Sequence, residues 1–184
     1  MAGSGPTNRG PQVPAGAARP ALDAVDLDLL AALSADAGST IKALANGLGL
    51  AESTCAYRLR ALRAAGVILG TRLDVDLKLL GYPLTAVVKV RLGNHSQSDV
   101  DQLYAAMASA PGVTQVLHLA GADDFHVQVV MRDSEALRDF VIQRISSHRI
   151  VRQTETQLVF SVRQGPGVLG PDPQPTRRRR GRPS

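Results

Sequence analysis

The 184-residue sequence lacks most of what an exported or membrane-spanning protein needs. It has one cysteine, Cys55, which cannot form an internal disulfide, and this fits a reducing compartment. No apolar run approaches the roughly 18 residues of a membrane span, and the N-terminus lacks the apolar segment of a secretory signal. We therefore expect a cytoplasmic protein with no membrane partner.

Histidine and aromatic residues are also scarce. The four histidines lack the spacing of a zinc site, so we expect neither a metal nor a cofactor. His118 and His126 flank one predicted loop and are interpreted as ordinary sheet residues, although His118 could face an effector pocket. With 3% aromatic residues and no tryptophan, the core must be built from alanine, leucine and valine, and Cys55 is interpreted as a small core residue.

Acidic residues are nearly absent from both ends of the chain, and the net charge of +5 arises there. Residues 1–20 carry +2 and residues 165–184 carry +4, which leaves −1 for residues 21–164. Both ends are rich in small and turn-forming residues, so we predict a disordered arm over 1–20 and a disordered tail over 165–184. Basic arms of this kind often contact nucleic acid.

The first predicted domain spans residues 21–70 and is mainly helical. Apolar residues at three- and four-residue spacing predict helices over 22–38, 40–48 and 52–65, and a short strand over 67–69. The last two helices are separated by a glycine-containing turn, which is typical of a helix-turn-helix. We predict the winged type of this motif.

The helix over 52–65 has a basic, polar side. Between Ser53 and Ala65 there are three arginines and no acid, and the apolar residues cluster on the opposite side. A helix with such a face is the one that enters the major groove of duplex DNA. The residues that we predict to contact DNA are Ser53, Thr54, Tyr57, Arg58, Arg60 and Ala61.

These contacts have plainer alternatives. Tyr57 and Arg60 would simply be solvated if the helix met no DNA. Arg58 borders the core, so it could instead pair with an acid such as Asp26 or Asp28.

The second predicted domain spans residues 84–164, after a linker over 71–83. Its hydrophobic pattern alternates with period two in the strands. We predict strands over 84–92, 113–120, 125–132 and 150–162, and helices over 98–110 and 133–145. This order is the split βαβ, or ferredoxin-like βαββαβ, arrangement, and the fold class of the whole chain is α+β.

Both domains have a predicted core. The residues that we expect to face it are Leu22, Val25, Leu29, Leu30, Leu33, Ile41, Leu44, Ala45, Leu48, Cys55, Leu59 and Leu62 in the first domain, and Ala86, Val88, Val90, Leu92, Val100, Leu103, Tyr104, Met107, Leu137, Phe140, Val141 and Ile145 in the second.

Residues 22–164 resemble the leucine-responsive/asparagine-regulator (Lrp/AsnC) family of transcription factors. The matching motifs run in the family's order across nearly all of the predicted folded chain. They are Leu22-Asp23 with Asp26 and Leu29-Leu30, Leu44-Ala45 through Gly49-Leu50, Tyr57-Arg58-Leu59 to Gly66-Val67-Ile68, Leu80-Gly81, Gly121 with Asp124, and Thr154 with Thr156.

The resemblance implies a homodimer, formed mainly through the C-terminal domains, that assembles into higher oligomers. It also implies an amino acid or related small molecule as effector, bound between dimers near the strand-joining loop. The residues assigned to this effector are Gly121, Ala122, Asp123, Asp124, Thr154 and Thr156. Loop backbone groups would hold a carboxylate and a loop side chain an amine, while the two threonine hydroxyls face one side of their strand.

Two positions depart from the family's pattern. Ala51 stands where the family has a serine that caps the recognition helix, a loss that typically costs about 1 kcal/mol unless Ser53 or Glu52 compensates. In the loop, Ala122-Asp123 replaces an acidic and then an aromatic residue. A second acid beside Asp124 favours a cationic partner group.

Arg180-Gly181-Arg182-Pro183 resembles the core of an AT-hook, in which an Arg-Gly-Arg segment lies in a narrow minor groove. The alternative is a nonspecific basic tail that adds affinity through counterion release. Arg180 and Arg182 therefore join the predicted DNA contacts.

The sequence favours a ligand-responsive, sequence-specific regulator that presents two recognition helices to half-sites about one helical turn apart. The alternative is an enzyme like the tetrapyrrole decarboxylases that share the two-domain plan. No nucleophile–base pair or phosphate loop is evident, so we predict no catalytic residues and no enzyme. A scaffold with a vestigial DNA domain is a third possibility, suggested only by Ala51 and the alanine-rich recognition helix.

Overall fold

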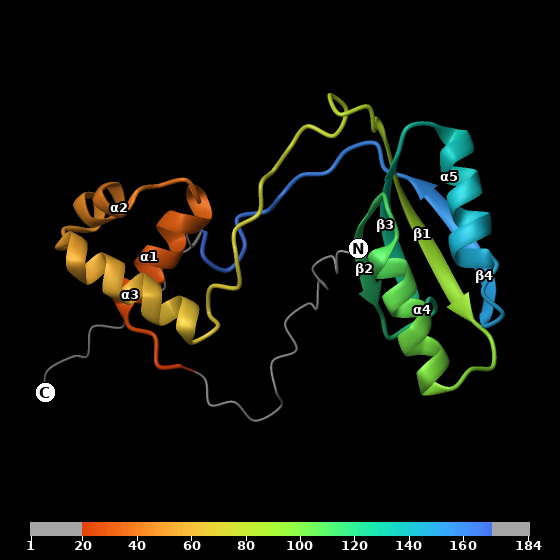
Figure 1. Cartoon of the computed structure of the whole chain (residues 1–184), viewed down its shortest axis with the longest axis horizontal. Helices are drawn as coiled ribbons and strands as arrows, with labels where there is room; N and C mark the ends of the chain where they lie inside the picture. Colours follow the sequence, from red (N-terminus) through yellow and green to blue (C-terminus); the bar gives the residue numbers. More distant parts are fainter. Residues whose placement is uncertain (1–19, 171–184) are drawn as a thin grey trace, which may run out of the picture. The chain divides into compact units, whose positions relative to one another are not determined.

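The computed structural model describes residues 20–170, which fold into two compact units (Figure 1). Residues 20–73 and 163–170 form the helical unit, and residues 74–162 form the sheet unit. No helix within residues 20–170 is long and apolar enough to cross a membrane. The predicted N-terminal arm and the tail arginines, Arg180 and Arg182 among them, lie outside the described residues.

The helical unit contains α1 (Ala24–Ala35), α2 (Ile41–Leu48) and α3 (Glu52–Ala64). Gly49 ends α2 in the left-handed conformation, with φ of 65°, and so makes the sharp turn that leads into α3. The three helices share one core, as the hydrophobic spacing predicts. Its buried members are Leu29, Leu44, Ala45, Cys55 and Leu59.

A reciprocal capping box begins α1. The Asp23 carboxylate accepts a hydrogen bond from the Asp26 amide at 2.9 Å, and the Asp26 carboxylate accepts one from the Asp23 amide at 3.2 Å. Two amides that the helix itself leaves without partners are satisfied in this way. The helix ends at Ala35 and not at Gly38 as predicted, because the Asp36 carboxylate accepts the Gly38 amide and holds these residues in a turn.

Three expectations for the helical unit are wrong. Residues 67–69 form no strand, because the amides of Val67 and Ile68 both donate to the Leu62 carbonyl and close the end of α3. Ile41 and Leu22 were expected in the core but are 43% and 37% exposed. Ile41 is the first residue of α2, and Leu22 precedes α1, so neither side chain is enclosed by a neighbouring helix turn.

The sheet unit has the predicted order of elements. They are β1 (Leu84–Leu92), α4 (Gln97–Ser109), β2 (Val113–His118), β3 (Phe125–Met131), α5 (Ser134–Phe140), the π-helical continuation η1 (Val141–Ser146) and β4 (Val151–Leu158). The four strands form one antiparallel sheet in the order β2-β3-β1-β4. Figure 1 shows α4 and α5 beside this sheet.

One face of the sheet packs against the helices. Ala86, Val88 and Val90 of β1 are fully buried, and their partners on β3 are Val129, Val127 and Phe125, also fully buried. The alternation predicted for β1 is therefore confirmed. The intervening residues, such as Lys89 and His126, lie on the opposite face, which we call the open face.

Some details of the sheet unit differ from prediction. β4 ends at Leu158 and not at 162, because β1 begins at Leu84 and offers no further partner beyond the bond from the Val159 amide to the Thr85 carbonyl. Tyr104 is 42% exposed, although its ring stacks on that of Phe125 with centroids 5.8 Å apart. The hydrophobic pattern also gave no sign of the π-helical segment after α5.

Candidate DNA-binding helix and effector loop

α3 presents a polar side to solvent. Cys55, Leu59 and Leu62 are buried and fix the helix to its unit. Of the predicted DNA contacts, five are exposed: Ser53, Thr54, Tyr57, Arg60 and Ala61. Tyr57 is 67% exposed, so most of its ring is accessible to a partner. The arrangement can offer a phenol, two hydroxyls and a guanidinium to a nucleic-acid groove.

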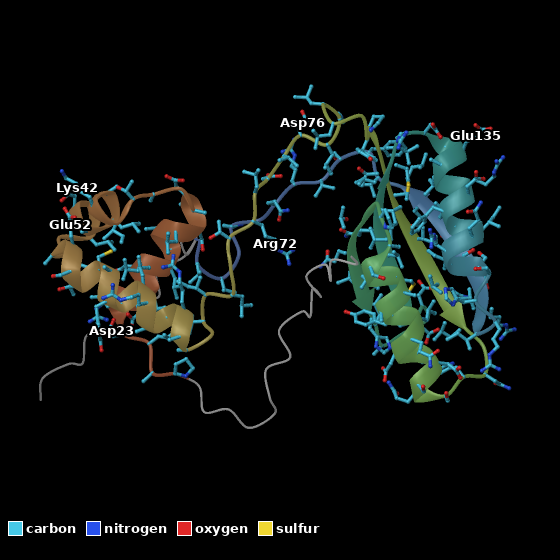
Figure 2. All side chains as sticks on the ribbon, in the orientation of Figure 1. Asp23, Lys42, Glu52, Arg72, Asp76 and Glu135 are labelled. Atoms are coloured by element: carbon cyan, nitrogen blue, oxygen red, sulfur yellow. The ribbon has the colours of Figure 1, made fainter. Side chains whose placement is uncertain are left out.

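The N-terminus of α3 has no side-chain cap. Ala51 occupies the cap position with extended backbone, and within the described chain no side-chain hydrogen bond is made from that position. Glu52 (labelled in Figure 2) lies in the first turn, where its charge complements the positive end of the helix. The amides of this turn remain available to an external acceptor such as a phosphate.

Arg58 is only partly exposed, and its guanidinium reaches back to the start of α1. Its Nη1 donates to an oxygen of Asp23 at 2.7 Å and to one of Asp26 at 2.8 Å; Asp23 is labelled in Figure 2. The hydrogen bonds that Arg58 donates to Asp26 and Asp23 raise the pKa of Arg58. The pKa of Asp23 is lowered, chiefly by the Asp26 amide and then by Arg58. Arg58 therefore takes up the pairing that the sequence offered as its alternative role, with Asp23 in place of Asp28.

The predicted effector loop joins β2 to β3. Asp124 is held inside it: its carboxylate accepts the Leu92 amide at 2.7 Å, and its own amide donates to the Val90 carbonyl at 2.9 Å. Gly121 has φ of 152° and an open space where a side chain would begin. The Asp124 carboxylate thus shapes the loop, and only its remaining acceptor capacity is available to a ligand amine.

Asp123 forms a charge cluster on the open face. Its carboxylate lies 2.8 Å from Arg91 Nε and 3.2 Å from His126 Nε2, and its side chain is only 14% exposed. These two hydrogen bonds, with that from Arg91 the larger, lower the pKa of Asp123, and the same contact raises that of Arg91. Lys89 and Glu155 form a neighbouring pair at 3.4 Å.

A residue of the chain itself, Arg91, thus supplies a cationic partner for Asp123. Sequence reasoning missed Arg91, Lys89 and Glu155 because they look like ordinary solvent-facing residues of alternating strands. The signal that could have found them is the same period of two, which places Arg91 and Lys89 on one face of β1.

Thr154 and Thr156 lie on the helix-facing side of β4, because they pair with the buried Val90 and Val88 of β1. Thr154 Oγ1 is 3.3 Å from the Ser146 hydroxyl, whereas Thr156 is exposed. Asp123 faces the other way. The structure thus separates the predicted effector residues onto two faces of one sheet and does not bring them into one pocket of the sheet unit.

His118 is a sheet residue, as expected, at the end of β2. Its ring stacks on Phe125 with centroids 4.6 Å apart. Within residues 20–170, no group of three or more His, Cys, Asp or Glu side chains is arranged to hold a metal ion.

A helix-turn-helix with an exposed basic recognition helix, joined in one chain to a ferredoxin-like unit, defines a class: DNA-binding regulators with a separate sensory domain. Family models match both parts, a winged helix-turn-helix DNA-binding domain over residues 22–68 and an Lrp/AsnC ligand-binding domain over residues 85–165. The chain belongs to the Lrp/AsnC family and is a DNA-binding transcriptional regulator.

Named relatives agree with this assignment. The chain is 38% identical over 148 residues to the HTH-type transcriptional regulator AldR of Mycobacterium tuberculosis, covering 80% of this chain and 83% of the relative. It is 34% identical over 139 residues to the leucine-responsive regulatory protein of Rhizobium meliloti, covering 76% of this chain and 89% of the relative.

Solved structures show the same architecture. The crystal structure of MtbAldR aligns with a TM-score of 0.64 at 34% identity, over 78% of this chain and 97% of that one. The structure of Escherichia coli AsnC aligns with a TM-score of 0.69 at 28% sequence identity, over 79% of this chain and 99% of that one. A Neisseria meningitidis transcriptional regulator in complex with L-Met aligns with a TM-score of 0.74 over 79% of this chain and 94% of that one. Its sequence identity is 23%, so this similarity concerns the fold alone.

Proposed function

We propose that this regulator reads its operator with the exposed side of α3 and that an amino acid or related small molecule modulates the binding. The observation that carries the first part is the set of five exposed polar or small residues on α3, backed by a buried apolar side. Such a helix can enter the major groove of duplex DNA without disturbing its own core. We place this function in the cytoplasm and assign the chain no catalytic step.

The contacts of α3 divide into two kinds. Arg60 and Tyr57 are exposed and have no ion pair among the residues described here, so they are proposed to meet bases or phosphates. Arg58 is bound to Asp23 and Asp26, and any contact to DNA is made by its remaining donors. Arg58 thus mainly orients α3, while Arg60 contributes a charge that DNA can neutralise.

The test is fluorescence-anisotropy binding of the full chain to its own upstream DNA at fixed salt. Arg60→Ala is expected to weaken binding about tenfold, since removing an arginine that contacts a base typically costs roughly 1–3 kcal/mol. Arg152→Ala removes the same charge from the exposed part of the sheet unit and is expected to change little. Equal losses in the two variants would mean that α3 contributes only general charge.

For the effector, we propose an amino acid held jointly by the loop residues and the two threonines. The support is the family's ligand-binding domain and the L-Met complex of the Neisseria meningitidis regulator. Because the loop carboxylate of Asp123 and the hydroxyl of Thr156 face opposite sides of one sheet, the site is proposed to be completed between copies of the chain. A homodimer, assembling further, supplies the second copy.

Titration of the protein–DNA complex with each amino acid should identify the effector as the one that shifts the anisotropy curve. Thr156→Val is then expected to weaken the response about threefold to tenfold, which corresponds to the removal of one hydrogen bond. Thr85→Val makes the same change on the open face and serves as the control. An unchanged response in Thr156→Val would remove this residue from the site.

A further inference from the structure

The helical unit has a groove of mixed apolar and polar lining, and none of the predicted DNA contacts of α3 lines it. Its cavity volume is about 540 Å³, and it runs between the three helices and the segment 67–72. Leu30 and Leu33 of α1, Leu44 of α2 and Leu59 of α3 supply much of its apolar wall. Ile41 lies at the same groove and is 43% exposed, so this apolar surface is not closed by the helices themselves.

One residue from a distant part of the sequence forms part of the wall of this groove. Leu169 is among its lining residues and is partly buried, although it follows the last strand of the sheet unit. The compact unit that contains α1, α2 and α3 also contains the chain from Arg163 to Gly170. In Figure 1 this is the blue end of the coloured trace, which lies beside the helices.

Residues 166–170, which belong to the stretch predicted as a disordered tail, form a turn that depends on two glycines. Gly167 has φ of 64°, which favours glycine, and the Gly170 amide donates to its carbonyl at 3.4 Å. A Cβ on Gly170 would clash with the Cβ and the carbonyl oxygen of Pro166, so a larger residue there would require the turn to shift. The turn leaves Val168 fully exposed and Leu169 partly buried.

This turn lies outside the part of the chain that the family's ligand-binding domain defines, since that match ends at residue 165. It therefore adds a feature to the shared architecture. It also comes directly before the arginine-rich stretch, in which Arg177 is seven residues beyond Gly170.

We infer that Pro166–Gly170 is an anchor that fastens the C-terminal segment to the DNA-binding unit through Leu169. The arginines of residues 177–182 follow this anchor in sequence, so the anchor limits how far the chain can carry them from the helical unit. Seven extended residues span at most about 25 Å, so Arg177 stays within that distance of the anchor. Holding a second DNA-binding element close raises its effective concentration at the operator. The inference rests on the proposed DNA contact of Arg180 and Arg182.

Cross-linking without DNA tests the anchor alone. In the full chain with Cys55→Ala, Val168→Cys and Ala37→Cys place one thiol beside the anchoring Leu169 and one at the groove, and a short bis-maleimide should join them within one chain. The same pair in a chain that also carries Leu169→Ser is the matched control, and its reaction should be several-fold slower because the anchoring side chain is gone. Equal rates for the two chains, or cross-links only between chains, would overturn the intramolecular anchor.

DNA binding tests what the anchor does. Leu169→Ser should weaken operator binding about threefold or more in the full chain and have no effect in a chain that ends at Gly170. Val168→Ser should be neutral in both chains. The truncation itself should flatten the salt dependence by about 0.9 for each phosphate that the tail no longer neutralises.

The two experiments separate the two ideas. If truncation leaves affinity and salt dependence unchanged, the proposed DNA role of the tail fails, while the cross-linking rates still report on the anchor. If truncation weakens binding but Leu169→Ser matches Val168→Ser, the anchor does not serve DNA binding and the inference is overturned.

Discussion

At the scale of single residues, Arg58 connects the recognition helix to the start of α1. Its guanidinium donates to both acids of the box that caps α1, at 2.7 and 2.8 Å. The side chain thus joins the start of one helix to the middle of another, and it adds to the packing of the buried residues of α3. Replacing it should disturb the helical unit before it disturbs any direct contact with DNA.

The pairing of Arg58 with Asp23 should appear as a coupling energy in a double-mutant cycle. The variants are Arg58→Ala, Asp23→Ala and the pair, measured by urea unfolding of the full chain. The pKa of Asp23 is lowered in the folded state. Its contribution is therefore fully present above the unfolded value, near pH 4, and is lost as the pH falls through the lowered value. The coupling should also weaken in high salt.

Asp28 provides the control for this cycle, since Arg58 makes its ion pairs with the other two acids of α1. The cycle of Arg58→Ala with Asp28→Ala should give no coupling at any pH. A coupling of equal size in both cycles would mean that Arg58 senses only the general charge of α1.

At the scale of elements, α3 is a helix whose position depends on packing more than on its ends. Three buried residues hold it, its first turn lacks a side-chain cap, and one ion-paired arginine ties it to α1. A helix that begins on uncapped amides keeps donors free for phosphate oxygens, at a cost in stability of the unbound protein.

Ala51→Ser should restore the missing cap and raise the free energy of unfolding by about 1 kcal/mol, since the serine hydroxyl can accept an amide of the first turn. Ala64→Ser places a hydroxyl at the other end of the same helix, where no free amide can donate to it. It should therefore not raise the free energy of unfolding. Urea unfolding of both variants measures this. A gain in Ala64→Ser equal to that in Ala51→Ser would point to solubility and not to capping.

Elements defined by their own side-chain pattern were predictable from the sequence. The alternation of β1 and the apolar side of α3 follow from residues that must face a core, so both were located closely. Features set by a distant partner were not. The end of β4 depends on where β1 begins, and the engagement of Asp123 depends on Arg91 across the loop. Spacing in one segment carries no information on such partners.

At the scale of the whole molecule, the sheet unit has a face that none of its own described helices covers. This open face carries the half-buried Val87 and Leu117 together with the cluster of Asp123, Arg91 and His126. A mixed apolar and charged sheet surface of this kind suits a second copy, which can bury the aliphatic side chains while the charges remain paired.

If the proposed homodimer uses this face, Val87→Asp should shift the full chain toward the monomer, because it adds an unpaired carboxylate to the buried surface. Ile142→Asp makes an equivalent change at a side chain of η1 that is 55% exposed, and it should leave the dimer intact. Sedimentation equilibrium over a range of concentrations measures both. A dimer that survives Val87→Asp unchanged would assign the contact to another surface.

The return of residues 163–170 to the helical unit has a consequence for cleavage. Between residues 20 and 170 the chain passes from one unit to the other twice, once through the linker and once through the segment before Pro166. If a protease cut the linker, the DNA-binding fragment would therefore not separate from the rest of the chain as long as Leu169 stays bound at the groove. The fragment of residues 20–73 would stay bound to the turn Pro166–Gly170. The product would be a noncovalent complex that contains both α3 and the sheet unit.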